Sequence, residues 1–127
     1  MSRSTCPFCP PDRDRVIRET ASAFALYDAF PAADGHVLIL PKDHVRSLYE
    51  LPVAIQAELW QLAAEMRNWL KQELNPDGFN VGLNDGKAAG QTVDHAHIHI
   101  IPRRTGDVED PRGGVRWVVP ERAKYWG

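Results

Sequence analysis

The chain has 127 residues, of which 43% are hydrophobic and 25% are charged, and these values are typical of one ordinary globular domain. Its formal net charge of -2 lacks the basic excess of most nucleic-acid-binding proteins, so we expect no nucleic acid as a partner. No window is apolar enough to cross a membrane, and the residues before Cys6 lack the apolar core of a signal peptide. We therefore predict a single domain over residues 1–127, with a cytoplasmic location and no membrane partner.

The first part of the chain predicts an irregular segment followed by short strands. Residues 1–15 are rich in proline and charge. Three short apolar runs come next, and they predict strands at Val16–Thr20, Ala23–Tyr27 and His36–Leu40. The Asp34-Gly35 pair is typical of a turn, and it leads into the third strand.

The clearest helix opens at Pro52, and the Asn75-Pro76-Asp77-Gly78 run ends it. Apolar residues recur along it at spacings of three and four and so share one face: Ile55, Leu59, Leu62, Met66, Trp69 and Leu70. We interpret this face as core packing and assign it no chemistry.

After the helix we expect strands at Phe79–Leu83 and Thr92–Ile101, joined by a loop that contains glycine. Residues 104–127 form a C-terminal tail, for which we predict an extended course with one short strand near Val115–Val119. The order of elements is three strands, a helix and two strands, with short connections. This order favours an antiparallel α+β sheet over alternating βαβ units.

Three histidines alternate with apolar residues in the segment His95-Ala96-His97-Ile98-His99. Successive side chains of a strand point to opposite faces, so the three imidazoles are expected to share one face and the apolar residues the other. A polar strand face without chemistry is one alternative, but sheet propensity does not explain three alternate histidines. A simple metal-binding face is the other, since imidazole is a common ligand.

A row of imidazoles also suits phosphoryl chemistry. A neutral imidazole can attack phosphorus, and a neighbouring histidine can stabilise the phosphate charge or protonate the leaving group. His97 is the middle histidine and is the natural nucleophile. Just upstream, Gln91 and Thr92 supply an amide and a hydroxyl as donors to phosphate.

The Cys6-Pro7-Phe8-Cys9 run has the spacing of a zinc-binding pair. A redox pair would need a helix N-terminus, which Pro10-Pro11 disfavours, and an unliganded pair is the other alternative. His44 and His95 are candidate third and fourth ligands. Two cysteines and two histidines make a closed tetrahedral set, so a zinc ion there would be structural rather than catalytic.

Two segments resemble the signature of the histidine-triad (HIT) superfamily. Gly90–Arg103 resembles its row of alternating histidines, and Asp34–Lys42 is similar to its other marked segment. The resemblance covers about Cys6 to Arg104. It implies a five-stranded antiparallel sheet with one long helix, paired into a homodimer through a continuous sheet. It also implies nucleotidyl transfer from a phosphoanhydride or phosphoramidate through a nucleotidyl-histidine intermediate.

The resemblance implies roles for individual positions. The catalytic positions are His97, His99, His36 and Gln91, with His97 as the nucleophile and His99 in contact with the scissile phosphate. The substrate-binding positions are Asp28, Asn84, Gln91, Thr92 and His99, with Asp28 on the ribose. Zinc-bearing members resemble the arrangement Cys6, Cys9, His44 and His95. An apolar purine pocket is expected among Phe8, Phe24, Leu26 and Leu38.

The tail after Thr105 resembles that of bacterial members described as diadenosine-tetraphosphate hydrolases. We therefore expect a nucleotide hydrolase of the dinucleoside polyphosphate type, with a purine nucleotide or dinucleoside polyphosphate as its ligand and structural zinc as its cofactor. The alternatives are nucleotidyl transfer to phosphate or another acceptor, and a nucleotide-binding protein with little turnover. The intact His97 disfavours the last, because a pure binder needs no nucleophile.

Overall fold

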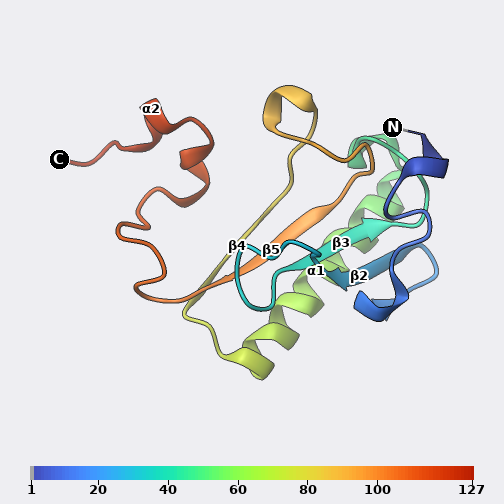
Figure 1. Ribbon diagram of the computed structural model, residues 1–127, viewed down its shortest axis with the longest axis horizontal. Coiled ribbons are helices and arrows are strands. Elements are labelled where there is room, and N and C mark those ends of the chain that lie inside the picture. Colours follow the sequence, from blue (N-terminus) through green and yellow to red (C-terminus); the bar gives the residue numbers. More distant parts are fainter. Residues whose placement is uncertain (1) are drawn as a thin grey trace.

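A computed structural model describes residues 2–127. Its centre is a five-stranded antiparallel sheet of β1 (Val16–Glu19), β2 (Ala23–Tyr27), β3 (Val37–Pro41), β4 (Gly78–Gly82) and β5 (Ile98–Arg103). The spatial order is β1-β2-β3-β5-β4. The long helix α1 (Val53–Leu74) lies across one face of this sheet, and a short helix, α2 (Pro120–Ala123), lies in the tail (Figure 1). The predicted α+β class, with its sheet and one long helix, is confirmed.

The alternation of side chains along the strands separates two apolar clusters. Ala25 of β2 and Ile98 of β5 belong to the larger cluster, which lies between the sheet and α1. Leu26 of β2 and Leu38 of β3 point the opposite way and pack against Phe8 of the N-terminal segment. The sheet is therefore covered on one face by α1, and part of its other face is covered by the cysteine-bearing segment.

The predicted apolar face of α1 is confirmed. Its buried residues are Leu59, Leu62, Ala63, Met66 and Leu70, and Ile55 and Trp69 pack beside them partly buried. The helix ends at Asn75, whose φ of 46° is the left-handed conformation common at helix C-termini. None of the helices in residues 2–127 combines the length and the apolar character needed to cross a membrane.

The turn into β3 requires glycine at position 35. Gly35 has a φ of +83°, and a Cβ atom there would lie 2.5 Å from Leu74 Cδ1 at the end of α1. A larger residue would therefore meet both backbone strain and a steric clash. This close approach fixes where His36 enters the sheet.

The strand of the triad is shorter than predicted, because β5 begins only at Ile98 rather than at Thr92. The preceding residues are held by irregular contacts instead of a ladder. The Ala96 N–H donates to the Val45 carbonyl at 2.8 Å, and the Gln91 amide donates to the Val93 carbonyl at 3.0 Å. Only His99 of the three triad histidines therefore lies within a regular strand.

The predicted strand near Val115–Val119 is wrong. The tail forms a 3-10 helix at Gly114–Val118 and then α2, and it projects from the β4 side of the sheet (Figure 1). Gly113 and Gly114 both have positive φ, which turns the chain out of the extended conformation. The Arg116 guanidinium then closes the turn by donating to the carbonyls of Arg122 and Ala123.

Candidate active site

A pocket of about 250 Å³ opens on the sheet face opposite α1. The N-terminal segment, the β2–β3 loop, β3, the loop after β4 and the triad segment all contribute to its walls. It brings together six of the predicted residues, namely Asp28, Asn84, Gln91, Thr92, His97 and His99. These residues are up to 71 positions apart, between Asp28 and His99, so their convergence depends on the order of the strands.

The backbone carbonyl two residues before His97 holds its ring in one tautomer. Its Nδ1 atom lies 2.7 Å from the His95 carbonyl oxygen. A carbonyl oxygen only accepts hydrogen bonds, so Nδ1 carries the hydrogen and Nε2 of the neutral ring keeps its lone pair. The ring packs edge-on between Phe8 and His99, with centroid distances of 5.6 Å and 4.9 Å. His97 is thus an oriented imidazole with a free basic nitrogen.

His36 and His99 form a directed hydrogen-bonded pair. The Ala32 N–H donates to His36 Nδ1 at 3.0 Å, so the hydrogen of a neutral His36 ring is on Nε2. That atom lies 2.9 Å from His99 Nδ1 and donates to it. The hydrogen of a neutral His99 ring is consequently on Nε2. His99 can therefore act as a hydrogen-bond donor within the pocket.

The surroundings of this pair keep both rings neutral. Burial, together with the nearby His97 and His36 rings, lowers the pKa of His99 to about 4, although the Asp28 carboxylate opposes the shift. Burial also lowers the pKa of His36, although the Asp28 carboxylate opposes that shift. Neutral rings at pH 7 agree with the tautomers derived above, in which each ring carries one N–H hydrogen.

Asp28 lies beside the pair rather than pointing freely into solvent. Its Oδ1 atom accepts from the Phe30 N–H at 2.8 Å, and its Oδ2 atom lies 3.5 Å from His36 Nε2. The Asp28, His36 and His99 ligand atoms lie within 4.8 Å of one another, a spacing compatible with a metal ion. The hydrogen bond between the two rings already uses one nitrogen of each, so a proton accounts for this geometry.

Gln91 is buried, and all three polar positions of its amide contact the backbone. Its Oε1 atom accepts from the Gly86 N–H, and its Nε2 group donates to the carbonyls of Arg46 and Val93. The side chain therefore ties the loop after β4 to the segment after β3. A direct contact of Gln91 with phosphate remains a prediction. In the structure the Gln91 side chain holds the loop after β4 in place.

We expect Gln91→Ala to lower the free energy of unfolding by about 2 kcal/mol, because buried backbone groups lose their partners. The loop that carries Asn84 should loosen, so KM for a nucleotide should rise more than kcat falls. Chemical denaturation and steady-state kinetics measure the two effects. The neighbouring Thr92→Ala, at an exposed position, is the control, and equal stability of both variants would contradict this assignment.

Asn84 and Thr92 are exposed side chains at the rim of the pocket. Within residues 2–127 neither side chain has a hydrogen-bond partner, so both are free to bind a ligand. Gly86 and Gly90, with φ of +98° and +96°, flank the short turn between them. The turn lets the chain reverse over the pocket and presents these two polar side chains to it.

Only two of the four residues expected to form a purine pocket line this cavity. Phe8 and Leu38 line the cavity, whereas Leu26 is completely buried in the core. Phe24 lies elsewhere, with Arg13 and Lys42 each 5.1 Å from its ring centroid. Alternation along β2 puts Phe24 and Leu26 on the correct face, but the pocket lies beyond both.

Phe30 and Arg15 are two of the lining residues that were not predicted. Phe30 is 89% exposed, which is unusual for an aromatic side chain, and it stands two residues after Asp28. Arg15 lines the opposite part of the wall and donates to the Tyr27 carbonyl at 3.3 Å. An apolar aromatic residue in a loop was a usable signal for Phe30, but no spacing in the sequence marks Arg15.

The four predicted metal ligands meet in one cluster at the edge of the triad segment. His95 Nδ1 lies 3.4 Å from the sulfur of Cys6, 3.4 Å from that of Cys9 and 3.3 Å from His44 Nδ1. Cys9 Sγ lies 3.5 Å from His44 Nδ1. Ligands of a tetrahedral zinc ion, at about 2.3 Å for sulfur and 2.0 Å for nitrogen, stand about 3.3–3.8 Å apart. The donor set therefore fits zinc in both chemistry and size.

The neighbours of the cluster also orient it. His95 Nε2 lies 2.8 Å from the Pro41 carbonyl and donates to it, which leaves Nδ1 facing the sulfurs. Burial lowers the pKa of His95, and burial together with the Cys6 thiol raises the pKa of Cys9 to about 11. A buried thiol, a half-buried thiol and a neutral imidazole are the surroundings in which a cation would replace protons.

Four of the five arginines from Arg103 onward are occupied within the protein. Arg103 is bound to Asp107 and Asn80, and Arg104 donates to the Leu74 carbonyl. The remaining two, Arg112 and Arg116, contact Asp110, Trp126, Tyr125 and backbone carbonyls within the tail. These side chains hold the tail in place and are not free for phosphate.

Comparison with known proteins identifies the family of this chain. The model of the HIT domain matches residues 11–106 of the chain. The chain belongs to the HIT-domain family. The predicted resemblance is thereby confirmed, and the row of triad histidines lies within the matched part of this HIT domain.

Relatives that are named for an enzymatic activity are similar to this HIT domain over most of its length. The bis(5'-adenosyl)-triphosphatase of Dictyostelium discoideum is 41% identical over 98 residues, 77% of this chain and 66% of that protein. The adenosine 5'-monophosphoramidase of Schizosaccharomyces pombe is 32% identical over 131 positions, 97% of this chain and 93% of that protein. A Zn-bound histidine triad family protein from Mycobacterium smegmatis has a TM-score of 0.75 and 32% identity, over 86% and 82% of the two chains.

Proposed function

We propose that this HIT domain is a nucleotide hydrolase that cleaves a nucleoside phosphoanhydride or phosphoramidate, with dinucleoside polyphosphates as its substrate class. One observation carries the proposal: His97 presents a free Nε2 lone pair, and the neighbouring His99 presents an N–H donor at the same pocket. A nucleophile beside a donor is what attack on phosphorus requires. The names of the two enzyme relatives, a bis(5'-adenosyl)-triphosphatase and an adenosine 5'-monophosphoramidase, support it.

The reaction proceeds in two displacements. Nε2 of His97 attacks the α-phosphorus, an N–P bond forms, and the bond from phosphorus to the leaving oxygen or nitrogen breaks. The leaving group takes a proton from solvent as it departs, and the attacking water of the second displacement returns a proton to solvent; His99 Nε2–H stabilises the phosphoryl charge in both steps. Water then attacks the same phosphorus, which breaks the N–P bond and returns the electron pair to His97. The product is a nucleoside monophosphate.

The pocket residues hold the nucleotide in this scheme. Asn84 and Thr92 donate to the phosphate and the leaving group, and Asp28 accepts from the ribose hydroxyls. Their exposure at the rim of the pocket supports these assignments for Asn84 and Thr92. Asp28 Oδ1 already accepts from the Phe30 N–H, so Oδ2, which lies 3.5 Å from His36 Nε2, is the atom assigned to the ribose hydroxyls. His36 acts through His99 and is a positioning residue.

Zinc is the proposed structural cofactor, held by Cys6, Cys9, His44 and His95. The spacing of these four donors supports this, and a solved relative is described as Zn-bound. The ion joins the N-terminal segment to the triad segment and supplies a cross-link rather than an open coordination position. His95 thereby fixes the carbonyl to which His97 donates.

A homodimer is proposed through β4, which lies at the edge of the sheet. Its outer edge carries backbone groups that pair with no strand within residues 2–127, and Val81 on it is 40% exposed. A second copy pairing there would continue the sheet. Sedimentation equilibrium measures the mass directly, and a monomer at micromolar concentration would contradict this assignment.

Product analysis tests the function. The purified zinc-replete chain is incubated separately with diadenosine tetraphosphate and with adenosine 5'-phosphoramidate, with and without inorganic phosphate. We expect AMP as the first product from both, with faster cleavage of the dinucleotide. ADP formed only with added phosphate would identify nucleotidyl transfer to phosphate instead. Binding of AMP with turnover no faster than buffer would overturn the hydrolase assignment in favour of a binding protein.

A further inference from the structure

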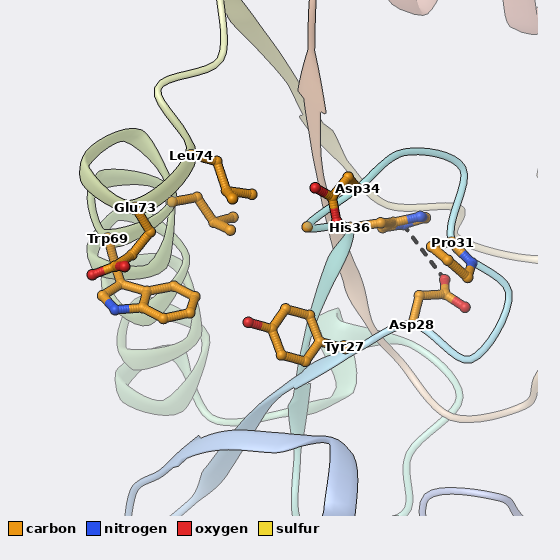
Figure 2. A pocket seen from close by; sticks show the side chains of 10 residues that line it. Tyr27, Asp28, Pro31, Asp34, His36, Trp69, Glu73 and Leu74 are labelled. Atoms are coloured by element: carbon orange, nitrogen blue, oxygen red, sulfur yellow. Dashed lines mark ion pairs between the residues drawn. The ribbon is translucent and has the colours of Figure 1, made fainter.

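A second cavity, of about 470 Å³, lies between the C-terminal half of α1 and the loop that joins β2 to β3 (Figure 2). Trp69 and Glu73 line it from α1, Tyr27 from the end of β2, and Asp34 from the loop. Tyr27 points to the α1 side of the sheet, as alternation along β2 requires. The α1 side of the cavity thus lies on the face opposite the catalytic pocket, and apart from Asp28 and His36, which also line it, none of its residues has been assigned a task.

Asp28 and His36 at one end of this cavity bind each other and their neighbours, but four other polar groups that line it have no partners within residues 2–127. The carboxylates of Asp34 and Glu73 make neither an ion pair nor a side-chain hydrogen bond, and the same holds for the Tyr27 hydroxyl and the Trp69 indole N–H. No lysine or arginine lines the cavity. Elsewhere on the surface the carboxylates of Asp107 and Glu19 are paired with basic side chains. The cavity is therefore an acidic site without its own counter-charge.

The aromatic side chains that line the cavity indicate which class of ligand it can bind. Figure 2 shows the Trp69 indole on α1 and the Tyr27 ring beside it, with the Tyr27 hydroxyl toward the indole and the Glu73 carboxylate next to the indole. Aromatic ring faces attract organic cations, and a carboxylate at the same place adds opposite charge. A strongly hydrated metal ion would instead need several oxygen ligands, which two aromatic walls do not offer. The volume lies in the range of about 300–1,000 Å³ usual for small-molecule sites.

We propose that this cavity binds an organic ammonium group, carried either by a small alkylamine or by a lysine side chain of another protein. The cation lies between the rings of Tyr27 and Trp69, and Asp34 and Glu73 neutralise its charge. Asp28 lines both this cavity and the catalytic pocket, so the two sites share one wall. Binding here needs no nucleotide, and its test is therefore independent of the proposed hydrolase function.

The test is an NMR titration of the 15N-labelled full chain with n-butylammonium chloride. We expect shifts centred on the Trp69 indole N–H and the amides of Tyr27, Asp34 and Glu73. n-Butanol, which has the same chain without the charge, and sodium chloride at equal ionic strength should produce none of them. Equal shifts with n-butanol would overturn the proposal, because they would show a purely apolar site.

Charge-removing variants give the second arm. Glu73→Gln should weaken n-butylammonium binding about five-fold, and Asp34→Asn combined with Glu73→Gln should weaken it further. Both positions are exposed, so the fold should persist, and the same spectra report it. Glu50→Gln removes an equal charge at an exposed position outside the cavity and should leave the affinity unchanged. Equal weakening in Glu50→Gln would show a non-specific charge effect and overturn the proposal.

A peptide distinguishes the two sources of the ammonium group. Acetyl-Gly-Lys-Gly-amide is titrated beside its Nε-acetyl-lysine counterpart, which lacks the charge. Binding about ten-fold tighter than n-butylammonium, lost on acetylation, assigns the cavity to a lysine of a partner protein. Binding no tighter than n-butylammonium assigns it to a small amine. Binding that survives acetylation would contradict recognition of an ammonium group altogether.

Discussion

His97→Ala is expected to lose turnover of both nucleotide substrates by a factor of at least about 10⁴ while it keeps its fold. The variant lacks the atom that forms the N–P bond, so no other group in the pocket can replace it. His99 and His36 hold each other through their ring nitrogens and leave no free lone pair aimed at phosphorus. Initial rates, and circular dichroism to verify the fold, measure the outcome.

His99→Ala provides the comparison for this prediction. It removes the donor to the phosphate but leaves the nucleophile, so its loss should be smaller, about 10²-fold to 10³-fold. Alkaline quenching followed by mass spectrometry should detect a nucleotidyl adduct in His99→Ala and none in His97→Ala. If His97→Ala keeps turnover within ten-fold of the parent chain, or still forms the adduct, His97 is not the nucleophile.

The loss of zinc is expected to have the largest effect on stability. Cys6→Ser removes one ligand of the cluster and should abolish stoichiometric zinc, lowering the free energy of unfolding by at least about 3 kcal/mol. A zinc ion held by the four ligands would link the N-terminal segment to the triad segment, and Phe8 of the former packs against the His95 and His97 rings. Activity should therefore decline with the metal, although the ion takes no part in the chemistry.

Zinc content and thermal unfolding, with and without a chelator, measure this effect. Chelator-treated parent chain and Cys6→Ser should unfold at the same temperature, well below the zinc-loaded chain. Thr5→Ala is the matched control, since its side chain is exposed and contacts only Ser2. A chain from zinc-replete medium that carries no zinc, or that unfolds identically with the chelator present, would exclude a structural metal.

Local patterns along the chain determined much of this protein. The spacing of the α1 residues requires one apolar face, because a helix repeats every 3.6 residues. The alternation of Ile98 and Ile100 with His97 and His99 separates a core face from a chemical face. The two-residue spacing between Cys6 and Cys9 is enough to suggest a metal-binding site. Periodicity and spacing are properties of neighbouring residues, so a single sequence displays them.

Contacts between distant segments were decided only by the tertiary structure. The register of β3 against β5 brings His36 next to His99. The tautomer of His99 therefore depends on His36, and the tautomer of His36 depends on the Ala32 N–H. The late start of β5 and the hydrogen bonds of the Gln91 amide to three backbone groups also depend on contacts between distant segments. A hydrogen bond is directional and needs both partners in place, whereas a sequence shows only which donors and acceptors exist.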